Sequence, residues 1–347
     1  MSHTIRDVAA AAGTSIKTVS RVVNNEAGVA AEMRERVREV IERLGYVPNI
    51  SARRLKSGKA ETIGLVLPRV ESPYAMRLLS CVLREASEQG YSVQVIESDP
   101  ELDKAKNAIE RAIQLRQVDG LLIAPPLLDC MELLGELNGR RFPYVIITPN
   151  NPESASYSVE VTDQAGTAEA ARYLLSLGHQ RIAYITCGPN FRFSRERLAG
   201  FTQEMELGGI PLHRQLILEG DTTFESGYQI TQKLLDLSFV PSAVLAGNDE
   251  MAVGVINYLS AKGIGVPQEI SVMGFDDMPI AKQVAPQLTT VCQPVDQIVQ
   301  SAVMLLVRLM QGGTTPDASH VQVHTRLVIR QSCAMIADTR LPIAGSL

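Results

Sequence analysis

Apolar residues recur along this chain at two different spacings, and the change lies near residue 60. Up to residue 45 they recur every three or four positions, which predicts amphipathic helices over Ile5–Ala12, Ile16–Val23 and about Ala31–Leu44. Gly13 suits the left-handed residue that ends a helix, and Ser15 suits the N-cap of the next one. The N-terminal part is therefore expected to be a small all-helical unit.

From residue 62 onward, short and almost wholly apolar runs alternate with longer amphipathic segments. The predicted strands are Ile63–Leu67, Ser92–Glu97, Gly120–Ala124, Tyr144–Thr148, Arg181–Thr186, Leu216–Glu219, Ala243–Ala246 and Ser271–Phe275. The predicted helices between them include Tyr74–Gln89, Asp163–Leu177, Ser194–Leu207, Glu225–Leu237 and Glu250–Lys262. Apolar strands that alternate with helices are typical of parallel sheets covered on both faces. About four strands precede Asp163 and four follow it, which predicts an α/β body of two doubly wound lobes.

The remaining segments complete the organisation. A helix at Asp296–Met310 and a late strand at Val321–Arg330 are expected to cross back between the lobes, so that each lobe is discontinuous. The expected parts are a head of residues 1–48, a linker of residues 49–60, a body of residues 61–332 and a tail of residues 333–347. Within the body, one lobe takes about 61–161 with 292–322, and the other about 162–290 with 323–332. The linker is too short for a stable isolated helix and should fold only against a partner.

Charge is divided unevenly between these parts. Residues 1–59 hold 11 Lys and Arg against 6 Asp and Glu, whereas residues 60–347 hold 22 against 32. A basic head on an acidic body indicates a unit that binds a polyanion, joined to a part with another task.

The stretch Thr14–Asn25, TSIKTVSRVVNN, places many hydrogen-bonding side chains on a helix barely two turns long. In a helix-turn-helix unit the second helix enters the major groove of DNA, and such a helix needs a polar face. The side chains expected on or beside that face are Ser15, Ile16, Lys17, Thr18, Ser20 and Arg21. The basic ones can reach guanine or phosphate, and the hydroxyls can bond phosphate oxygens. The alternative interpretation is a polar surface helix in a small bundle.

Several classes of function are disfavoured by what the sequence lacks. It has no apolar run of about 18 residues and no apolar signal region, so we expect a cytoplasmic protein with no membrane partner. The five cysteines form no CxxC pair, as in a reducing compartment. His320 and His324 lie on a predicted strand, about 13 Å apart, which is too far to share a metal ion. Because no nucleophile, phosphate-binding or dinucleotide motif is complete, we expect neither an enzyme nor a cofactor.

The head and linker contain IRDVAAAAGTSIKTVSRVVNN and RERVREVIERLGYVPNISARRLKSG, and the body contains LLSLGHQRIAYI, GNDEMAVGVINYL and ISVMGFDD. These motifs strongly resemble the lac repressor family, and the resemblance runs from Thr4 to Ser332. It implies a helix-turn-helix head that binds DNA, a hinge helix, and a body with the two-lobed fold of periplasmic sugar-binding proteins. A bacterial transcription regulator is the function that such a chain is expected to have.

The resemblance also implies which residues contact DNA. The recognition helix matches Ser15–Val23, where Ile16 and Lys17 hold the two positions that chiefly read bases. The hinge helix matches Asn49–Ser57, and Leu55 holds the position of a leucine wedged into the minor groove, where it would unstack one base step. The full set of expected DNA contacts is Thr4, Thr14, Ser15, Ile16, Lys17, Thr18, Ser20, Arg21, Asn24, Asn49, Ala52, Arg53, Leu55 and Lys56.

In the body, ligands of such sheets lie beyond the carboxyl ends of the strands, in the cleft between the lobes. Arg197, Asn248 and Asp276 match positions that contact effectors in the family, and their groups suit paired sugar hydroxyls. The full set of expected effector contacts is Ser72, Tyr74, Pro126, Thr148, Phe193, Arg197, Thr222, Asn248 and Asp276. The expected ligand is a neutral or weakly acidic carbohydrate or glycoside. The alternative is that Arg197 and Asp276 form an internal salt bridge with no ligand role.

These expectations combine into a repressor that binds a near-palindromic operator as a homodimer and is released by a small inducer. A dimer is favoured over a tetramer because the tail after Ser332 has no sustained heptads. Control by a co-repressor, control by a protein partner, and a sugar receptor that never binds DNA remain the alternatives.

Overall fold

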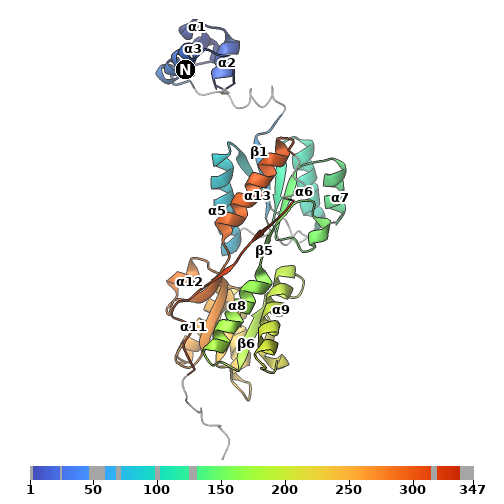
Figure 1. Cartoon of the computed structure of the whole chain (residues 1–347), viewed down its shortest axis with the longest axis vertical. Coiled ribbons are helices and arrows are strands. Elements are labelled where there is room, and N and C mark those ends of the chain that lie inside the picture. Colours follow the sequence, from blue (N-terminus) through green and yellow to red (C-terminus); the bar gives the residue numbers. More distant parts are fainter. Residues whose placement is uncertain are drawn as a thin grey trace, which may run out of the picture. The chain divides into compact units, whose positions relative to one another are not determined.

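The structure is a computed structural model that describes residues 3–23, 26–46, 59–67, 72–97, 102–124, 131–313 and 319–336. The chain forms two compact units, Met1–Ala60 and Glu61–Leu347 (Figure 1). In the described residues, no helix has both the length and the apolar character needed to span a bilayer.

The first unit is a bundle of three helices, α1 (Ile5–Ala12), α2 (Ile16–Val23) and α3 (Ala31–Leu44). Its core consists of small and β-branched side chains from all three helices, together with Tyr46, which follows α3: Val8, Ala9, Ala12, Val19, Val22, Val37, Val40 and Tyr46. Gly13 and Gly45 end α1 and α3 in the left-handed conformation, with φ of 64° and 58°. The three helices were predicted with these bounds because their apolar spacing and their end signals agree.

The first lobe of the second unit is built on a six-stranded parallel sheet. Its strands lie in the order β11-β5-β4-β3-β1-β2. The strand bounds are β1 (Thr62–Leu67), β2 (Ser92–Glu97), β3 (Gly120–Ile123), β4 (Tyr144–Ile147), β5 (Ser158–Val161) and β11 (His320–Val323). The helices of this lobe are α5 (Pro73–Glu88), α6 (Leu102–Gln114), α7 (Met131–Gly139) and α13 (Val295–Met310).

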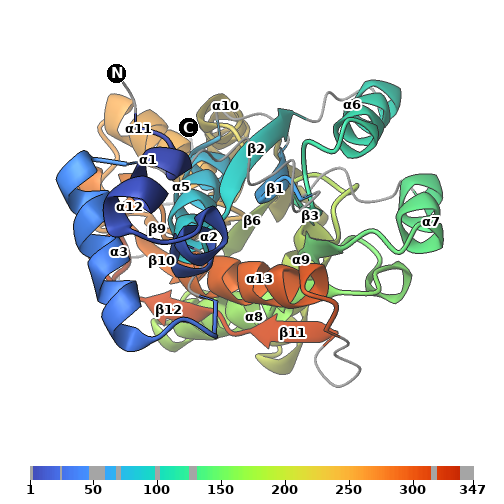
Figure 2. The ribbon, with the colours of Figure 1, turned by 90° about the horizontal axis from the view of Figure 1, so that it is seen from above.

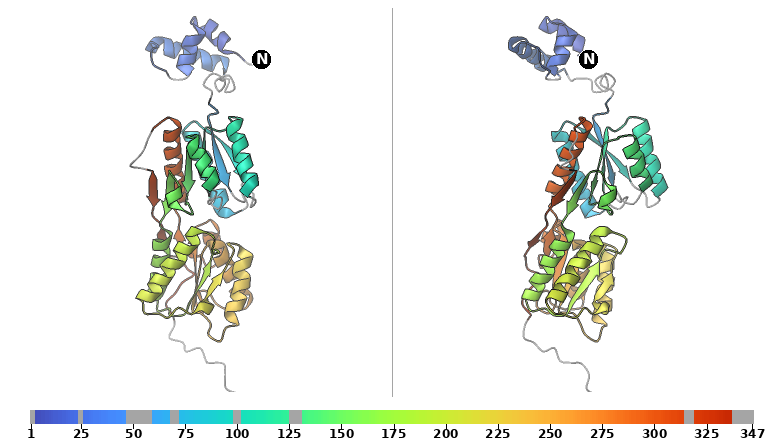
Figure 3. Two further views of the ribbon diagram at one scale, coloured as in Figure 1. Left: turned by 90° about the vertical axis from the view of Figure 1, so that its right-hand side faces the viewer. Right: turned by 45° about the vertical axis from the view of Figure 1, so that its right-hand side comes forward.

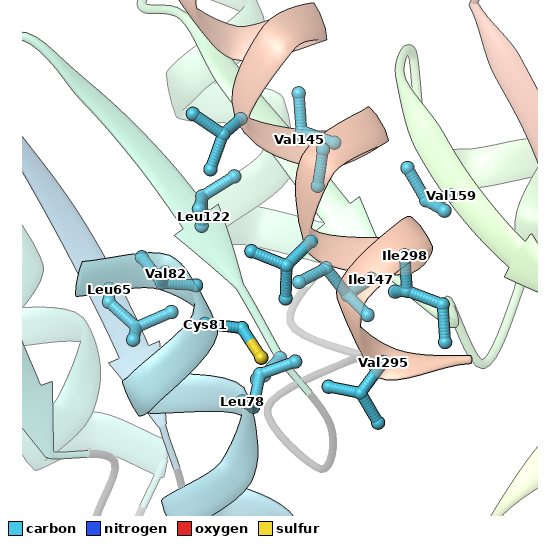
Figure 4. Close-up of a cluster of buried hydrophobic side chains, with 14 of the residues drawn as sticks. Leu65, Leu78, Cys81, Val82, Leu122, Val145, Ile147, Val159, Val295 and Ile298 are labelled. Atoms are coloured by element: carbon cyan, nitrogen blue, oxygen red, sulfur yellow. The ribbon is translucent and has the colours of Figure 1, made fainter. Parts of the chain in front are cut away.

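Helices cover both faces of this sheet. Successive residues of a strand point to opposite faces, so neighbouring residues pack against different helices. Leu65 packs with α5 and α13, whereas the next residue, Val66, packs with α6 and α7. Figure 2 shows the two helix pairs on opposite sides of the strands, and Figure 4 shows the layer formed by α5 and α13. That layer joins Leu78, Cys81 and Val82 of α5 and Val295 and Ile298 of α13 to Leu65, Leu122, Val145, Ile147 and Val159 of the sheet.

The second lobe has the same plan. Its strands lie in the order β12-β10-β9-β8-β6-β7, and all pairs are parallel except β10 with β12. The strand bounds are β6 (Ile182–Thr186), β7 (Ile217–Glu219), β8 (Ala243–Ala246), β9 (Ser271–Asp276), β10 (Thr289–Cys292) and β12 (Arg326–Val328). One face packs against α8 (Asp163–Ser176) and α9 (Arg192–Leu207), and the other against α10 (Phe224–Leu235) and α11 (Asp249–Ala261). The short helices are α12 (Ile280–Gln283), η1 (Pro152–Ser154) and η2 (Arg214–Leu216).

The chain passes between the two lobes at three places: from β5 into α8, from β10 into α13, and from β11 into β12 (Figure 3). The first and third crossings are joined by hydrogen bonds. The Thr325 backbone N–H donates to Thr162 Oγ1 at 3.0 Å, and the Thr162 backbone N–H donates to the Val323 carbonyl at 3.1 Å. The two lobes are therefore connected by paired segments of backbone, and the fold class predicted from the sequence is confirmed.

Two features of the body differ from the prediction. The late strand expected over Val321–Arg330 is wrong: the segment forms β11 in one sheet and β12 in the other, separated by the crossing. The strands β5 and β10 were not predicted, because each has only four residues and the sequences SVEV and TTVC mix polar residues with apolar ones.

The segment after β12 stays on the second lobe, where it is held by a buried histidine. His179 Nδ1 lies 3.0 Å from Ser242 Oγ, and its Nε2 lies 3.1 Å from both Ser271 Oγ and the Ala334 carbonyl oxygen. Close by, the Ile336 backbone N–H donates to the Leu177 carbonyl at 2.9 Å. Burial lowers the pKa of His179 below its ordinary value of 6.5, because a buried imidazolium loses its hydration.

This histidine should make attachment of the segment depend on pH. A histidine with a lowered folded pKa contributes stability above its unfolded pKa, and that contribution is lost as the pH falls through the folded value. Below pH 6.5 we therefore expect the protection factor of the Ile336 amide against hydrogen exchange to decrease. In the His179→Gln variant the same protection factor should vary little with pH. A decrease of equal size in both proteins would assign the effect to another group.

Candidate functional site

The exposed face of α2 carries the polar residues that the sequence predicts. Ser15, Ile16 and Lys17 are exposed, whereas Val19 and Val22 are buried against the other two helices. Ser15 Oγ accepts a hydrogen bond from the Thr18 backbone N–H at 3.1 Å, so Ser15 caps the helix as expected. Ile16 is 45% exposed. The start of α2 therefore presents an exposed apolar side chain next to the positively charged Lys17.

The other predicted DNA contacts on the head differ in how their side chains are used. Thr4 forms a capping box with Asp7, in which Thr4 Oγ1 donates to Asp7 Oδ2 at 2.8 Å and accepts from the Asp7 backbone N–H at 3.4 Å. Thr14, Ser20 and Arg21 are half-buried. The predicted contacts Asn24, Asn49, Ala52, Arg53, Leu55 and Lys56 lie outside the described residues, as does Pro126 of the effector set.

In the second unit, Arg197 of α9 is the centre of a buried ionic cluster. Its Nε donates to Asp163 Oδ1 at 2.7 Å, its Nη1 donates to the Gly247 carbonyl at 2.6 Å, and its Nη2 lies 3.4 Å from Asp276 Oδ1. The guanidinium carbon lies 3.6 Å from the centre of the Phe275 ring and 4.9 Å from that of Phe193. The guanidinium is therefore held between aromatic rings and in contact with two carboxylates.

Asp276, at the end of β9, has a backbone φ of 110°, which is unusual for a residue with a side chain. Its Oδ1 accepts a hydrogen bond from Gln293 Nε2 at 2.6 Å. Burial raises the pKa of Asp276 to about 6, although the neighbouring Arg197 charge opposes the shift. Burial likewise raises the pKa of Asp163, again against the opposing charge of Arg197. Both carboxyl groups therefore lose hydration in the folded protein, and contacts with neighbouring side chains hold them in place.

Tyr74 and Thr148 come from the first lobe and approach this cluster. Burial raises the pKa of Tyr74, and the negative charges of Asp276 and Asp163 raise it further. Thr148, which follows β4 with a φ of 47°, lines a cavity together with Phe193 and Asp163. Four of the predicted effector residues are therefore brought together: Thr148, Phe193, Arg197 and Asp276.

The other predicted effector residues have structural partners. Asn248 caps α11 by accepting from the Met251 backbone N–H at 3.0 Å, and its Nδ2 donates to the Thr222 carbonyl at 2.8 Å. Asn248 and Thr222 are thus joined to each other, and the Gly247 carbonyl links them to Arg197. Ser72 Oγ caps α5 by accepting a hydrogen bond from the Ala75 backbone N–H at 3.4 Å.

The cavity lies between residues of both lobes. Thr148, Pro149, Glu160, Val161, Asp163, Arg192, Phe193 and Glu196 line it. Arg192 of α9 joins the lobes here, because its Nη2 donates to Glu160 Oε2 at 3.0 Å and its Nε donates to Glu196 Oε1 at 2.7 Å. Among the described residues, no group of three metal-ligating side chains is present, and His320 Nδ1 lies 2.9 Å from Ser158 Oγ.

Sequence reasoning missed several residues of the cavity lining and of the Arg197 cluster: Glu160, Asp163, Arg192, Glu196 and Gln293. Asp163 follows β5 and Gln293 follows β10, the two strands that were not predicted. Had those strands been recognised, the rule that ligands lie beyond strand ends would have included both side chains.

Two family models match the chain. Residues 4–49 match the model of bacterial regulatory proteins, lacI family, and residues 171–333 match the periplasmic binding protein-like domain. The curated relatives include the HTH-type transcriptional regulator DegA of Bacillus subtilis (strain 168), 35% identical over 86% of this chain and 88% of its own. Catabolite control protein A of Priestia megaterium is 33% identical over 96% of this chain and 99% of its own.

Solved structures match both units of the chain. The lac repressor dimer bound to operator and the anti-inducer ONPF has a TM-score of 0.81 at 29% identity, covering 96% of this chain and 100% of that one. The complex of the transcriptional regulator CelR with cellobiose has a TM-score of 0.72 at 29% identity, covering 95% of this chain and 99% of that one.

Proposed function

The chain belongs to the lacI family of bacterial regulatory proteins, and on that premise we propose that it represses transcription from a near-palindromic operator until a small carbohydrate releases it. The observation that carries this proposal is that head and body together match a repressor dimer bound to its operator. The relatives are transcription regulators, which supports a chain that acts on DNA in the bacterial cytoplasm and performs no catalysis. It works as a homodimer, because one head reads only half of a palindrome.

On the head, α2 supplies the base contacts. Ile16 and Lys17 are exposed at its N-terminal end, the end that enters the major groove in helix-turn-helix proteins. Lys17 suits the guanine acceptors O6 and N7, and Ile16 suits a thymine methyl group. The basic residues near the linker add phosphate contacts, which make operator binding weaken as salt is raised.

The effector binds where the two lobes meet, beside the cluster formed by Asp163, Arg197 and Asp276. The carboxylates accept hydrogen bonds from sugar hydroxyls, and the guanidinium donates to them. The regulator CelR was solved with cellobiose, which supports a sugar in the corresponding position here. We expect Asp276→Asn to weaken sugar binding by at least about tenfold, as measured by calorimetry, since it removes a charged acceptor. Unchanged affinity would remove Asp276 from the site.

Release follows from coupling between the cleft and the linker of residues 49–60. The three crossings let the lobes move relative to each other without breaking either sheet. Closure of the cleft on a sugar shifts the first lobes of the dimer relative to each other, and the hinge segments lose their mutual packing on DNA. The coupling free energy of such switches is about 1–3 kcal/mol.

The proposal is tested by gel retardation of an operator selected from a random DNA pool, with and without a panel of sugars. Release by one sugar supports it. Tighter retardation by a sugar would instead identify a co-repressor, indifference to every sugar would favour control by a protein partner, and failure to retard any DNA would leave only a sugar receptor.

The linker gives a second test, in which Leu55 is the proposed minor-groove wedge. Leu55→Ala should lower affinity for the operator by at least about tenfold and change non-specific binding little, because only the operator is kinked at the wedge. Lys56→Ala is the matched neighbour: loss of a phosphate contact should weaken binding to both DNAs alike. Equal loss on both DNAs for Leu55→Ala would contradict the wedge.

A further inference from the structure

Among the described residues, the cavity between the lobes has more acidic than basic side chains. Its lining includes three carboxylates, Glu160, Asp163 and Glu196, and Asp276 joins them through Arg197. The cations in contact with these four groups are the guanidiniums of Arg192 and Arg197. In the part of the chain that the structure describes, these four carboxylates and two guanidiniums leave an excess of two formal negative charges.

Both guanidiniums already have protein acceptors at each of their three nitrogens. Arg192 donates to Glu196, to Glu160 and, through Nη1, to the Pro149 carbonyl at 3.3 Å. Arg197 contacts Asp163, the Gly247 carbonyl and Asp276. Proteins hold phosphates and carboxylates mainly through paired N–H groups of arginine. Each guanidinium keeps two further N–H groups that can donate to a hydroxyl, but its positive charge is already opposed by carboxylates, so an entering anion would meet the excess negative charge of the cavity.

The carboxylates of the cavity are also poorly hydrated. Glu196 has its pKa raised mainly by burial, as do Asp163 and Asp276. A further negative charge in the same space would repel all of them, because Coulomb interactions are strong where water is excluded. A hydroxyl or an ammonium group, in contrast, donates hydrogen bonds to carboxylate oxygens, which can only accept.

We infer that this cleft selects its effector by charge, taking a sugar that bears only hydroxyl or amino groups and excluding sugars that bear a phosphate or a carboxylate. The inference rests on the proposed function in one respect, that the cavity is the effector site. It narrows the sequence-based expectation, which included weakly acidic sugars.

The test is calorimetry on the full chain with matched sets of sugars. Each set contains a neutral sugar, its amino derivative, its uronic acid and its 6-phosphate, for example glucose, glucosamine, glucuronate and glucose 6-phosphate. In any set whose neutral member binds, we expect the amino derivative to bind at least as tightly. The uronic acid and the phosphate should bind roughly 100-fold more weakly or not at all.

A uronic acid or sugar phosphate that binds as tightly as its neutral parent would overturn the inference and leave a sugar-controlled repressor standing. Binding by no neutral or amino sugar would overturn it as well. The gel assay without effector tests DNA binding separately. Retardation of the operator would show that the DNA-binding function holds even when the inference about sugar charge fails.

Charge-neutralising variants test the cause. The double variant Glu160→Gln and Glu196→Gln removes two negative charges and frees Arg192, so affinity for the 6-phosphate should rise roughly tenfold or more. Glu206→Gln is the matched control, because Glu206 is exposed on the same helix and outside the cavity lining. The control should leave the ratio of phosphate to neutral affinity unchanged. An unchanged ratio in the double variant, shown to be folded by its melting temperature, would overturn the inference.

Discussion

Replacing Arg197 by leucine should lower the free energy of unfolding of the body by about 3–5 kcal/mol, because it leaves two buried carboxyl groups without their counter-charge. Asp163 and Asp276 both contact this guanidinium, and their side chains are only 3% and 10% exposed. The measurement is urea denaturation followed by circular dichroism. Arg195→Leu is the control on the same helix: Arg195 is exposed, and its loss should change the free energy by less than about 1 kcal/mol.

The same variant should also change the dependence of stability on pH. A carboxyl group whose folded pKa lies above its unfolded value binds a proton more readily in the folded protein, so acidification stabilises the fold. In the wild type this applies to Asp276 between its ordinary pKa of 3.8 and about 6. Without Arg197 the window should extend above pH 6, since the opposing charge is gone. Equal losses for Arg197→Leu and Arg195→Leu would show that the cluster is not strongly coupled.

Replacing Gly227 by alanine should destabilise the second lobe by about 3 kcal/mol, because α10 and α11 approach each other through glycine. An added Cβ at Gly227 would lie 2.1 Å from the Met251 carbonyl oxygen, and one at Gly254 would lie 2.2 Å from the Phe224 carbonyl oxygen. Backbone atoms cannot rotate away, so the helices would have to separate. Thermal unfolding of the full chain measures the effect.

Gly135→Ala provides the opposite case. Gly135 lies in α7, is exposed, and has no atom within 4 Å of an added Cβ. Alanine there should stabilise the protein by roughly 0.5–1 kcal/mol, because it reduces the conformational freedom of the unfolded chain. If both substitutions moved the melting temperature in the same direction, close packing of α10 on α11 would not explain the glycine at 227.

The elements that sequence patterns predicted well are those whose own residues carry a clear apolar pattern. Ser92–Glu97 and Ala243–Ala246 have the predicted bounds, and the body helices for which bounds were predicted, α5, α8, α9, α10, α11 and α13, begin and end within two residues of prediction. No bounds were predicted for α6, α7 and α12. The predictions failed where a strand depends on its neighbours. At β5 and β10 the strands are set by the sheet on which they pair, and their own residues carry only a weak apolar pattern.

The site follows the same division. Arg197 and Asp276 could be named from their family positions, and the structure places them in one cluster. Asp163 and Gln293 complete that cluster from distant parts of the sequence, which no local pattern relates. For Asn248, the family position predicted a ligand contact. The structure shows that its side chain caps α11 by accepting from the Met251 backbone N–H. Such a cap depends only on the N–H groups of the next helical turn.

The interleaving of the lobes has a consequence for how such chains can diverge. Because β11 and α13 belong to the first lobe but follow the second in sequence, neither lobe can be excised or exchanged as one continuous stretch. Recombination between relatives can graft a new head with a single breakpoint near residue 60, where the two compact units meet. A change in the effector that the cleft recognises must instead come from individual substitutions or from inheritance of the whole body. Operator preference and effector preference therefore evolve by different routes.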